Sequence, residues 1–237
     1  MRAQMTANAY SEQMDLPSPE LSSVALRLPA EAIALPQARA LARGRTLDAG
    51  DDATTLIAGA LDWCDAATVT HQHRVGAIGM AIAGEMGLPR KRARLIGFAG
   101  LVHDIGEGLV RRERSGGNGE FTAEDIALEQ AHVRLGYNVL RSFGFPWPIA
   151  ATVLQHHERF DGSGYPKGLK GEEILLDARI IAVADIIEVL ACEQGSDCTE
   201  RGFAAALVEI EARKGQYYDA AVVEAALRLF REKGYTF

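Results

Sequence analysis

Cysteine is scarce in this sequence. Only Cys64, Cys192 and Cys198 occur among 237 residues, and no two of them form a CxxC pair. Their odd number and wide spacing are typical of a protein kept in a reducing compartment, so we expect ordinary free thiols and a cytoplasmic location. The same scarcity argues against a structural metal site built on thiolates.

Long apolar runs and an excess of basic charge are also missing. No run of about 18 apolar residues occurs, so no membrane span is predicted, and the N-terminus lacks the basic-then-apolar pattern of a signal peptide. The formal net charge is −7. Non-specific binding of DNA or RNA needs basic patches, so neither is expected as a partner. A phosphate substrate is still compatible with the acidity, because bound metal ions can invert the local charge.

The alternating pattern of β-strands is the third absence. From about residue 52 onward the apolar periodicity is helical, which predicts an all-α domain over residues 52–237 with about seven helices in its core. The expected helices lie near 69–86, 90–104, from 122 onward, from Pro148 to His156, and near 173–192, 200–213 and 218–233. Residues 1–51 carry Pro17, Pro19, Pro29 and Pro36 in an Ala/Leu-rich context. This segment is predicted to be a short N-terminal appendage, either a small helical element, a linker or an interaction segment.

Histidines and carboxylates stand at helix ends and inside apolar runs. Asp185 lies in a helix that is apolar all round, where an ionised carboxylate is costly unless it pairs with a cation or binds metal. On this helix alone a salt bridge to an arginine is as good an interpretation as a metal ligand. The positions of the histidines favour metal, and imidazole with carboxylate suits Fe, Mn or Zn. The six histidines are His71, His73, His103, His132, His156 and His157.

The order of these motifs resembles the HD-GYP subfamily of the HD-superfamily metal-dependent phosphohydrolases. His103-Asp104 is similar to the HD motif, and the run from His156 to Pro166 is similar to the HHE…DG.GYP signature without gaps. The remaining matches are His71-Gln-His-Arg74-Val75, His132 with Leu135-Gly136-Tyr137, and Ala178-Arg179-Ile180 through Ala184-Asp185. The resemblance implies an all-α HD-domain helical bundle.

The resemblance also implies a binuclear centre of divalent transition metals, Fe or Mn. Asp104 would bridge the two metals. A third metal in some family members uses a Glu four residues before the first histidine, where this chain has Ala67, so we expect two. His73 is two residues from His71 and faces elsewhere on the helix, so it is predicted not to be a ligand. The implied ligands are His71, His103, Asp104, His132, His156, His157 and Asp185.

The reaction implied by the resemblance is hydrolysis of cyclic di-GMP, or a related cyclic dinucleotide, to linear pGpG or GMP. A hydroxide that bridges the metals would attack phosphorus, which is plausible chemistry because the cations depress the pKa of bound water. The catalytic candidates are Asp104 and Glu107. The substrate-binding candidates are Asp161, Gly164, Tyr165, Pro166, Lys167 and Arg179.

The chain departs from the family pattern on the substrate side. Glu107 stands where the family's HD motif usually continues to Lys. It could repel phosphate, donate a proton if burial raises its pKa, or be a solvent-exposed residue with no role. The family's Lys-Pro-Gly-type loop before the third helix is absent, and Arg114 to Gly119 stands there instead. The Arg-Pro-Tyr-type motif after the last ligand helix is missing too, and that segment reads Glu193 to Asp197. The basic residues that could compensate are Arg111, Arg112, Arg114, Lys167, Lys170 and Arg179.

Three functions are therefore open. The first is an active cyclic-dinucleotide phosphodiesterase in bacterial second-messenger signalling. The second is a weakly catalytic or inactive module that binds the nucleotide or docks a diguanylate-cyclase-type partner. The third is an HD phosphohydrolase that acts on another nucleotide. A homodimer is compatible with each of them.

Overall fold

The computed structural model describes residues 66–107, 123–141, 145, 147–192 and 198–236. The predicted appendage at 1–51 lies outside this range. In the described part the chain forms seven α-helices and no strand, which confirms the all-α prediction. The helices are α4 (Ala66–Glu85), α5 (Arg90–Val102), α7 (Ala123–Leu140), α8 (Ile149–Gln155), α9 (Leu176–Ala191), α10 (Glu200–Ala212) and α11 (Ala220–Leu227).

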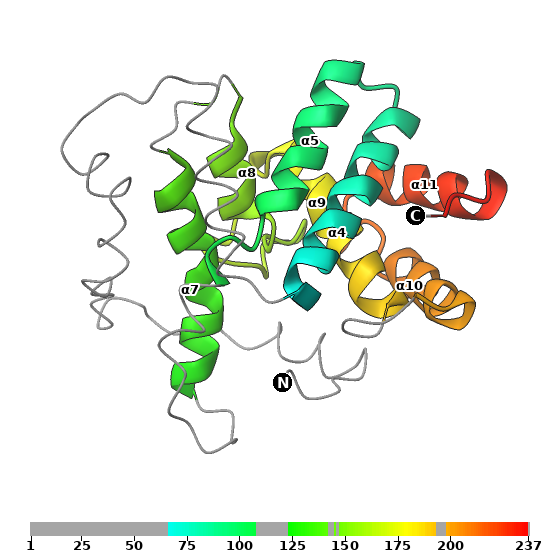
Figure 1. Cartoon of the computed structure of the whole chain (residues 1–237). Helices are drawn as coiled ribbons and strands as arrows, with labels where there is room; N and C mark the ends of the chain where they lie inside the picture. Colours follow the sequence, from blue (N-terminus) through cyan, green and yellow to red (C-terminus); the bar gives the residue numbers. More distant parts are fainter. Residues whose placement is uncertain (1–65, 108–122, 142–144, 146, 193–197, 237) are drawn as a thin grey trace.

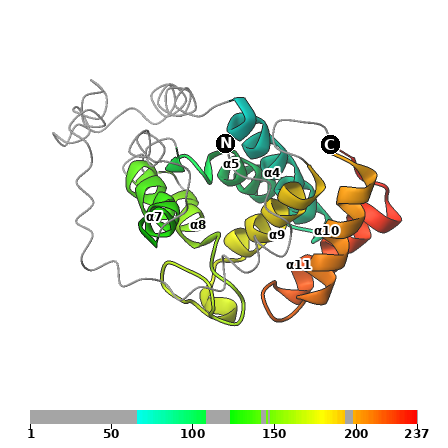
Figure 2. The same cartoon turned by 90° about the horizontal axis from the view of Figure 1, so that it is seen from below.

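Helices α4, α5 and α9 form the middle of the molecule (Figures 1 and 2). Helix α4 packs against both α5 and α9. Helices α7 and α8 pack on each other on one side of this group, and α10 and α11 lie on the other side (Figure 2). The loop between α8 and α9 contains the GYP run, and its Tyr165 packs with Val133 of α7 and Leu154 of α8.

Glycines allow α4 and α5 to approach very closely. A Cβ on Gly100 would lie 2.7 Å from the Cα of Gly76, and a Cβ on Gly76 would lie 2.6 Å from the carbonyl oxygen of Gly97. Real Cβ atoms do not come this near to backbone, so larger residues would push the helices apart. The close crossing brings the N-terminal half of α4 next to the C-terminal end of α5, where His103 and Asp104 follow.

Helix α9 is the most buried element. Its isoleucines and small residues, such as Ile180, Ala184 and Ile187, are fully buried in the main core cluster. A helix that is apolar on every face must be covered on every face. The charged residues Asp185 and Glu188 are buried with them, at 6% and 5% exposure. Any charge on this helix therefore needs a partner inside the protein.

Several helix boundaries differ from the predictions by a few residues. Pro148 is the N-cap of α8 and not its first helical residue. A short 3₁₀ turn at Gly171–Glu173 precedes α9, which begins only at Leu176. The last predicted helix, 218–233, is α11 continued by a π-helical turn at Arg228–Glu232. Helix ends depend on local hydrogen bonding, which the apolar periodicity does not report.

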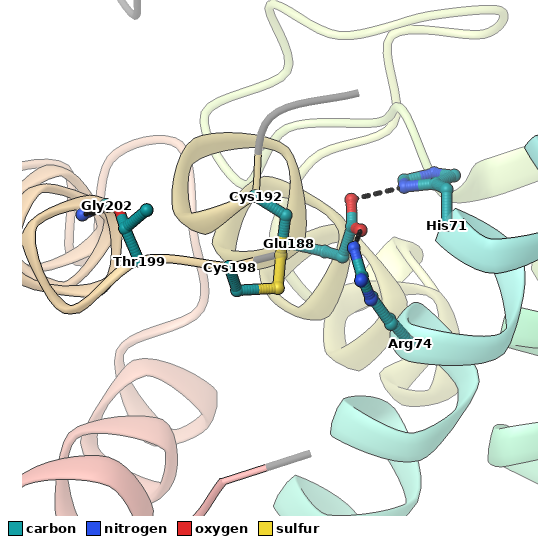
Figure 3. Close-up of a disulfide and its surroundings, with 7 residues drawn as sticks. All are labelled: His71, Arg74, Glu188, Cys192, Cys198, Thr199 and Gly202. Atoms are coloured by element: carbon teal, nitrogen blue, oxygen red, sulfur yellow. Dashed lines mark hydrogen bonds and ion pairs between the residues drawn. A yellow bond between two sulfur atoms is a disulfide. The ribbon is translucent and has the colours of Figure 1, made fainter. Parts of the chain in front are cut away.

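Cys192 and Cys198 form a disulfide between the C-terminal end of α9 and the segment that leads into α10 (Figure 3). The prediction of free thiols is therefore wrong for these two residues, and the cysteine argument for a reducing compartment no longer holds. Cys64 lies outside the described residues. Sequence spacing hid the pair, because the local pattern does not show that the end of α9 lies beside the residue before α10.

The described helices include none that combines the length and the apolar character needed to cross a membrane.

Candidate metal centre

The carboxylate of Asp104 lies at the centre of the candidate site. Its Oδ2 is 3.2 Å from His103 Nε2 and 3.6 Å from His71 Nε2. Its Oδ1, on the other side, is 3.3 Å from His132 Nε2 and 3.6 Å from His156 Nε2. Each oxygen thus faces a different pair of imidazoles, which is the arrangement that a bridging carboxylate requires.

The predicted ligands gather into two groups that share Asp104. The ligand atoms of each group lie within 4.8 Å of one another. The first group combines His71 from α4 with His103 and Asp104, just after α5. The second combines Asp104 with His132 of α7 and with His156 and His157 at the end of α8.

Asp185 of α9 joins the first group. Its Oδ1 is 3.3 Å from His71 Nε2 and 3.9 Å from His103 Nε2. The alternative left open by the sequence, a salt bridge to an arginine, is not what the described residues show around this carboxylate, because its recorded ion pairs are with these two imidazoles. All seven predicted ligands thus lie in one cluster, to which several helices contribute.

The outer nitrogens of three imidazoles are held by hydrogen bonds. Nδ1 of His103 lies 2.7 Å from the carbonyl oxygen of Gly100, and Nδ1 of His156 lies 2.7 Å from that of Val153. Nδ1 of His71 lies 2.6 Å from Oε2 of Glu188. In the neutral form of each ring such an acceptor favours the proton on Nδ1, which leaves the Nε2 lone pair for the cluster.

The surroundings of Asp104 and His157 keep these two residues in the forms that bind a cation. Burial alone would raise the pKa of Asp104, but the imidazoles of His103, His132 and His156 hold that pKa well below its usual range. Burial and the nearby His156 and His132 imidazoles hold the pKa of His157 well below its usual value. An ionised carboxylate and a neutral imidazole are the forms that coordinate metal.

The pKa of His71 is shifted in the opposite direction from that of His157. Burial lowers the pKa of His71, but hydrogen bonds to Asp104, Asp185 and Glu188 outweigh burial and raise that pKa well above its usual value. In the absence of a cation the three carboxylates therefore draw a proton onto this imidazole. The first group carries more negative charge than the second, and a divalent cation would replace that proton.

The GYP run forms a loop whose tyrosine packs on the site. The ring of Tyr165 stacks on the imidazole of His157, with centroids 4.8 Å apart and planes 27° apart. Glu158 anchors the loop: its two carboxylate oxygens accept hydrogen bonds from the backbone N–H of Lys167 and Leu169, at 2.8 and 2.9 Å. The loop is thus positioned by the residue that directly follows the two histidines.

The predicted substrate-binding residues are spread around this loop. Asp161 is partly buried, and its Oδ1 accepts hydrogen bonds from the backbone and hydroxyl of Ser163, so it stabilises the turn. Pro166 is half-buried and Lys167 is exposed. Arg179 forms an ion pair with Asp219 and lies over the ring of Phe160, so its guanidinium ties α9 to the start of α11.

Glu107 is only 5% exposed. The interpretation of this residue as a solvent-exposed side chain without a role is therefore wrong. It lies immediately after the HD motif, with its backbone N–H bonded to the carbonyl of Asp104 at 2.8 Å. His73 is exposed, in line with the prediction that it faces away from the cluster, and Lys170 is exposed too. Arg111, Arg112, Arg114 and residues 193–197 lie outside the described part of the chain.

Two buried acids of the site were not among the predicted residues. Glu158 fixes the GYP loop, and Glu188 contacts both His71 and Arg74. A signal existed for Glu188, since it is a second acid in an apolar helix, three residues after Asp185 and so on the same face. For Glu158 the neighbouring histidines gave no hint of a structural role.

The donor set fits divalent metal ions. Nε2 of His156 is buried with no hydrogen-bond partner, although it points at Asp104 from 3.6 Å. Leaving a buried nitrogen unpaired costs about 1–3 kcal/mol, and a bound metal ion would offset that cost. Imidazole and carboxylate donors without thiolate suit Fe, Mn or Zn.

The profile of the HD domain family matches residues 55–222. The chain belongs to the HD domain family. This confirms the relationship inferred from the HD and GYP motifs.

The HD domain is 33% identical over 174 residues to RpfG, a cyclic di-GMP phosphodiesterase response regulator of Xanthomonas campestris, covering 73% of this chain and 46% of that protein. It is 31% identical over 172 residues to the 3′3′-cGAMP-specific phosphodiesterase 2 of Vibrio cholerae, covering 70% of this chain and 32% of that protein.

The fold agrees with this assignment. The structure of Bd1817, a HDG"Y"P protein from Bdellovibrio bacteriovorus, superposes with a TM-score of 0.56 at 16% identity, covering 94% of this chain and 80% of that one. This likeness shows the HD-domain fold. The match spans less than half the length of the two curated relatives, so their activities are those of longer proteins.

Proposed function

We propose that this HD domain is a metal-dependent phosphodiesterase that hydrolyses cyclic di-GMP or a related cyclic dinucleotide to a linear product. The observation that carries the proposal is the position of Asp104, whose two oxygens face two separate sets of imidazoles. Curated relatives over the same residues are phosphodiesterases of cyclic di-GMP and of 3′3′-cGAMP.

The proposed centre takes two metals, with Fe or Mn as the candidates. His71, His103 and Asp185 would hold one, His132, His156 and His157 the other, and Asp104 both. Divalent cations bound there would supply a nucleophile at neutral pH and neutralise the charge of the phosphodiester. An acidic chain needs that neutralisation, because its own net charge of −7 repels the substrate.

The chain's own residues would position the dinucleotide. Tyr165 stacks on His157, and with the neighbouring Pro166 it would form part of the rim of the site. Lys167 is exposed on the same loop and could contact a phosphate. Glu107 is buried and follows the HD motif closely, so it is our candidate for the group that donates a proton to the leaving oxygen.

A single preparation tests the proposal. Metal content is measured after purification, and turnover of cyclic di-GMP and 3′3′-cGAMP is followed with Mn(II) or Fe(II) by separation of the linear products. We expect two metals per chain and turnover of at least one substrate. Asp104→Ala should lose one or both metals and all activity. An unchanged metal content in that variant would refute the shared-carboxylate assignment.

A receptor function is the second candidate, and two observations favour it. The family's lysine position is occupied by Glu107, which is buried, and Arg179 is already paired with Asp219. Both reduce the positive charge available to grip phosphates. In that case calorimetry would show micromolar binding of a cyclic dinucleotide without hydrolysis by the fully metal-loaded protein. A module of this kind would act by docking a partner, with a diguanylate-cyclase-type protein as the candidate.

The role of Glu107 separates the two candidates further. If Glu107 is the proton donor, Glu107→Gln lowers kcat and Glu107→Lys does not restore it. If Glu107 only repels phosphate, Glu107→Lys raises activity toward cyclic di-GMP. Each variant is compared at full metal occupancy, so that the difference reports on chemistry and not on loading.

A further inference from the structure

We infer that Glu188 is the positioning residue of the His71 half of the metal centre, and that it raises the affinity of that half for its cation. The inference rests on the proposed metal centre. It adds an acid that is not itself a proposed ligand, because its carboxylate reaches the cluster only through His71.

The contacts of Glu188 are those of a carboxylate clamped on both sides (Figure 3). Oε2 lies 2.6 Å from Nδ1 of His71, and Oε1 accepts from Nη1 of Arg74 at 3.4 Å. The side chain is only 6% exposed. Burial excludes water from the His71 contact, and the arginine limits the rotation of the carboxylate.

Two other imidazoles of the cluster are oriented by backbone carbonyl groups and not by a side chain. His103 and His156 each contact the carbonyl oxygen of the residue three positions earlier, Gly100 and Val153. Those acceptors belong to the backbone of the ligands' own segments and are present whenever these segments fold. His71 depends on a side chain from another helix, 117 residues away in sequence.

A charged acceptor changes the imidazole more than a carbonyl does. A carboxylate that takes the Nδ1 hydrogen bond fixes the tautomer and raises the donor strength of Nε2. Nε2 of His71 is the atom directed at the cluster, 3.3 Å from both His103 Nε2 and Asp185 Oδ1. Glu188 therefore acts on the ligand atom from the far side of the ring.

The test is a metal titration of the apo-protein with Mn(II) against a competing chelator, which resolves two binding steps. Glu188→Gln keeps the shape and removes the charge. We expect it to weaken one step about 10–100-fold, the usual effect of losing such an outer partner, and to leave the other step within about threefold. His71→Ala identifies the affected step, because it should abolish the same one.

Glu85→Gln is the matched control. Glu85 is also a carboxylate of the central helices clamped by cations, with Oε1 near Nε of Arg228 at 3.1 Å and Oε2 near Nζ of Lys233 at 2.6 Å. It has no recorded contact with the cluster. Both binding steps should stay at wild-type strength in this variant, although its melting temperature should fall.

The outcomes separate the inference from the proposed function. Wild-type affinity at both steps in Glu188→Gln, or equal weakening of both, overturns the inference. If the wild type binds two metals without turning over any cyclic dinucleotide, the proposed activity fails while the role of Glu188 stands. A wild type that binds no metal overturns both. Should Glu188→Gln not fold, Glu188→Asp, which retains the charge but is one methylene shorter, must show the same one-step weakening.

Discussion

At the scale of single residues, one glycine decides whether the GYP loop can take its shape. A Cβ on Gly164 would lie 2.3 Å from the backbone nitrogen of Arg159 and 2.4 Å from the carbonyl oxygen of His157. Both atoms belong to backbone that cannot move without displacing His157. A larger residue at position 164 would therefore displace the backbone of His157 and disturb both the loop and the metal cluster.

Gly164→Ala should therefore damage stability and the site together. We expect the free energy of unfolding to fall by about 1–3 kcal/mol, the usual cost of overpacking, and the affinity for metal to fall with it. Urea denaturation and metal titration measure the two effects. Gly84→Ala is the control: Gly84 lies exposed on α4, and apart from its chain neighbours and the backbone of its own helix no atom lies within 4 Å of the added Cβ. That variant should be neutral or stabilised by up to about 1 kcal/mol. Equal behaviour of the two variants would contradict the argument.

The resemblance to the HD-GYP family implied the five histidines and two aspartates of the cluster, and the structure brings all seven together. The order of the HD and GYP motifs along the sequence carried that information. Glu158 and Glu188 could not be found in the same way, because each acts through a loop or helix contact that no local pattern encodes. The burial of Glu107 could not be predicted from the sequence either, because it depends on which residues pack over the end of α5.

At the scale of helices, the positions of the elements follow from apolar periodicity, and their exact ends do not. Helices α4, α5 and α9 were predicted to within a few residues because each carries a long apolar pattern. The start of α9 was placed too early because the 3₁₀ turn at Gly171–Glu173 has helix-like composition. There Glu173 Oε2 accepts from the backbone N–H of Lys170 and so caps the start of the turn. The next residue, Ile174, is extended and separates the turn from α9.

The disulfide between α9 and the segment before α10 should contribute to the free energy of unfolding. Cys192 and Cys198 are six residues apart, and a closed loop of that size stabilises by about 2 kcal/mol in the chain-entropy estimate. The double variant Cys192→Ala/Cys198→Ala should lose this amount in urea denaturation under non-reducing conditions. A reductant should cause a similar loss in the wild type and none in the variant. A reductant that leaves wild-type stability unchanged would show that the two thiols are not joined in solution.

At the scale of the whole molecule, the metal centre is where separate parts of the fold meet. Its candidate ligands come from α4, from the segment after α5, from α7, from the end of α8 and from α9. The cluster also gathers two buried carboxylates with five imidazoles, and among the described residues the ion-pair partners of both carboxylates are these imidazoles. Such a site is electrostatically strained when empty, so binding of metal and stability of the fold must be linked.

Removal of metal should therefore loosen the whole domain and not the site alone. A cation present at 100 times its dissociation constant stabilises the folded state by about 2.7 kcal/mol, provided that the unfolded chain does not bind it. We expect chelator-treated protein to melt at a lower temperature, and Mn(II) to restore the melting temperature in a concentration-dependent way. Asp104→Ala supplies the comparison, because the loss of the shared carboxylate should make its melting temperature respond much less to Mn(II). If chelation leaves the wild-type melting temperature unchanged, the cluster is held together by its own hydrogen bonds and its role as a metal centre is refuted.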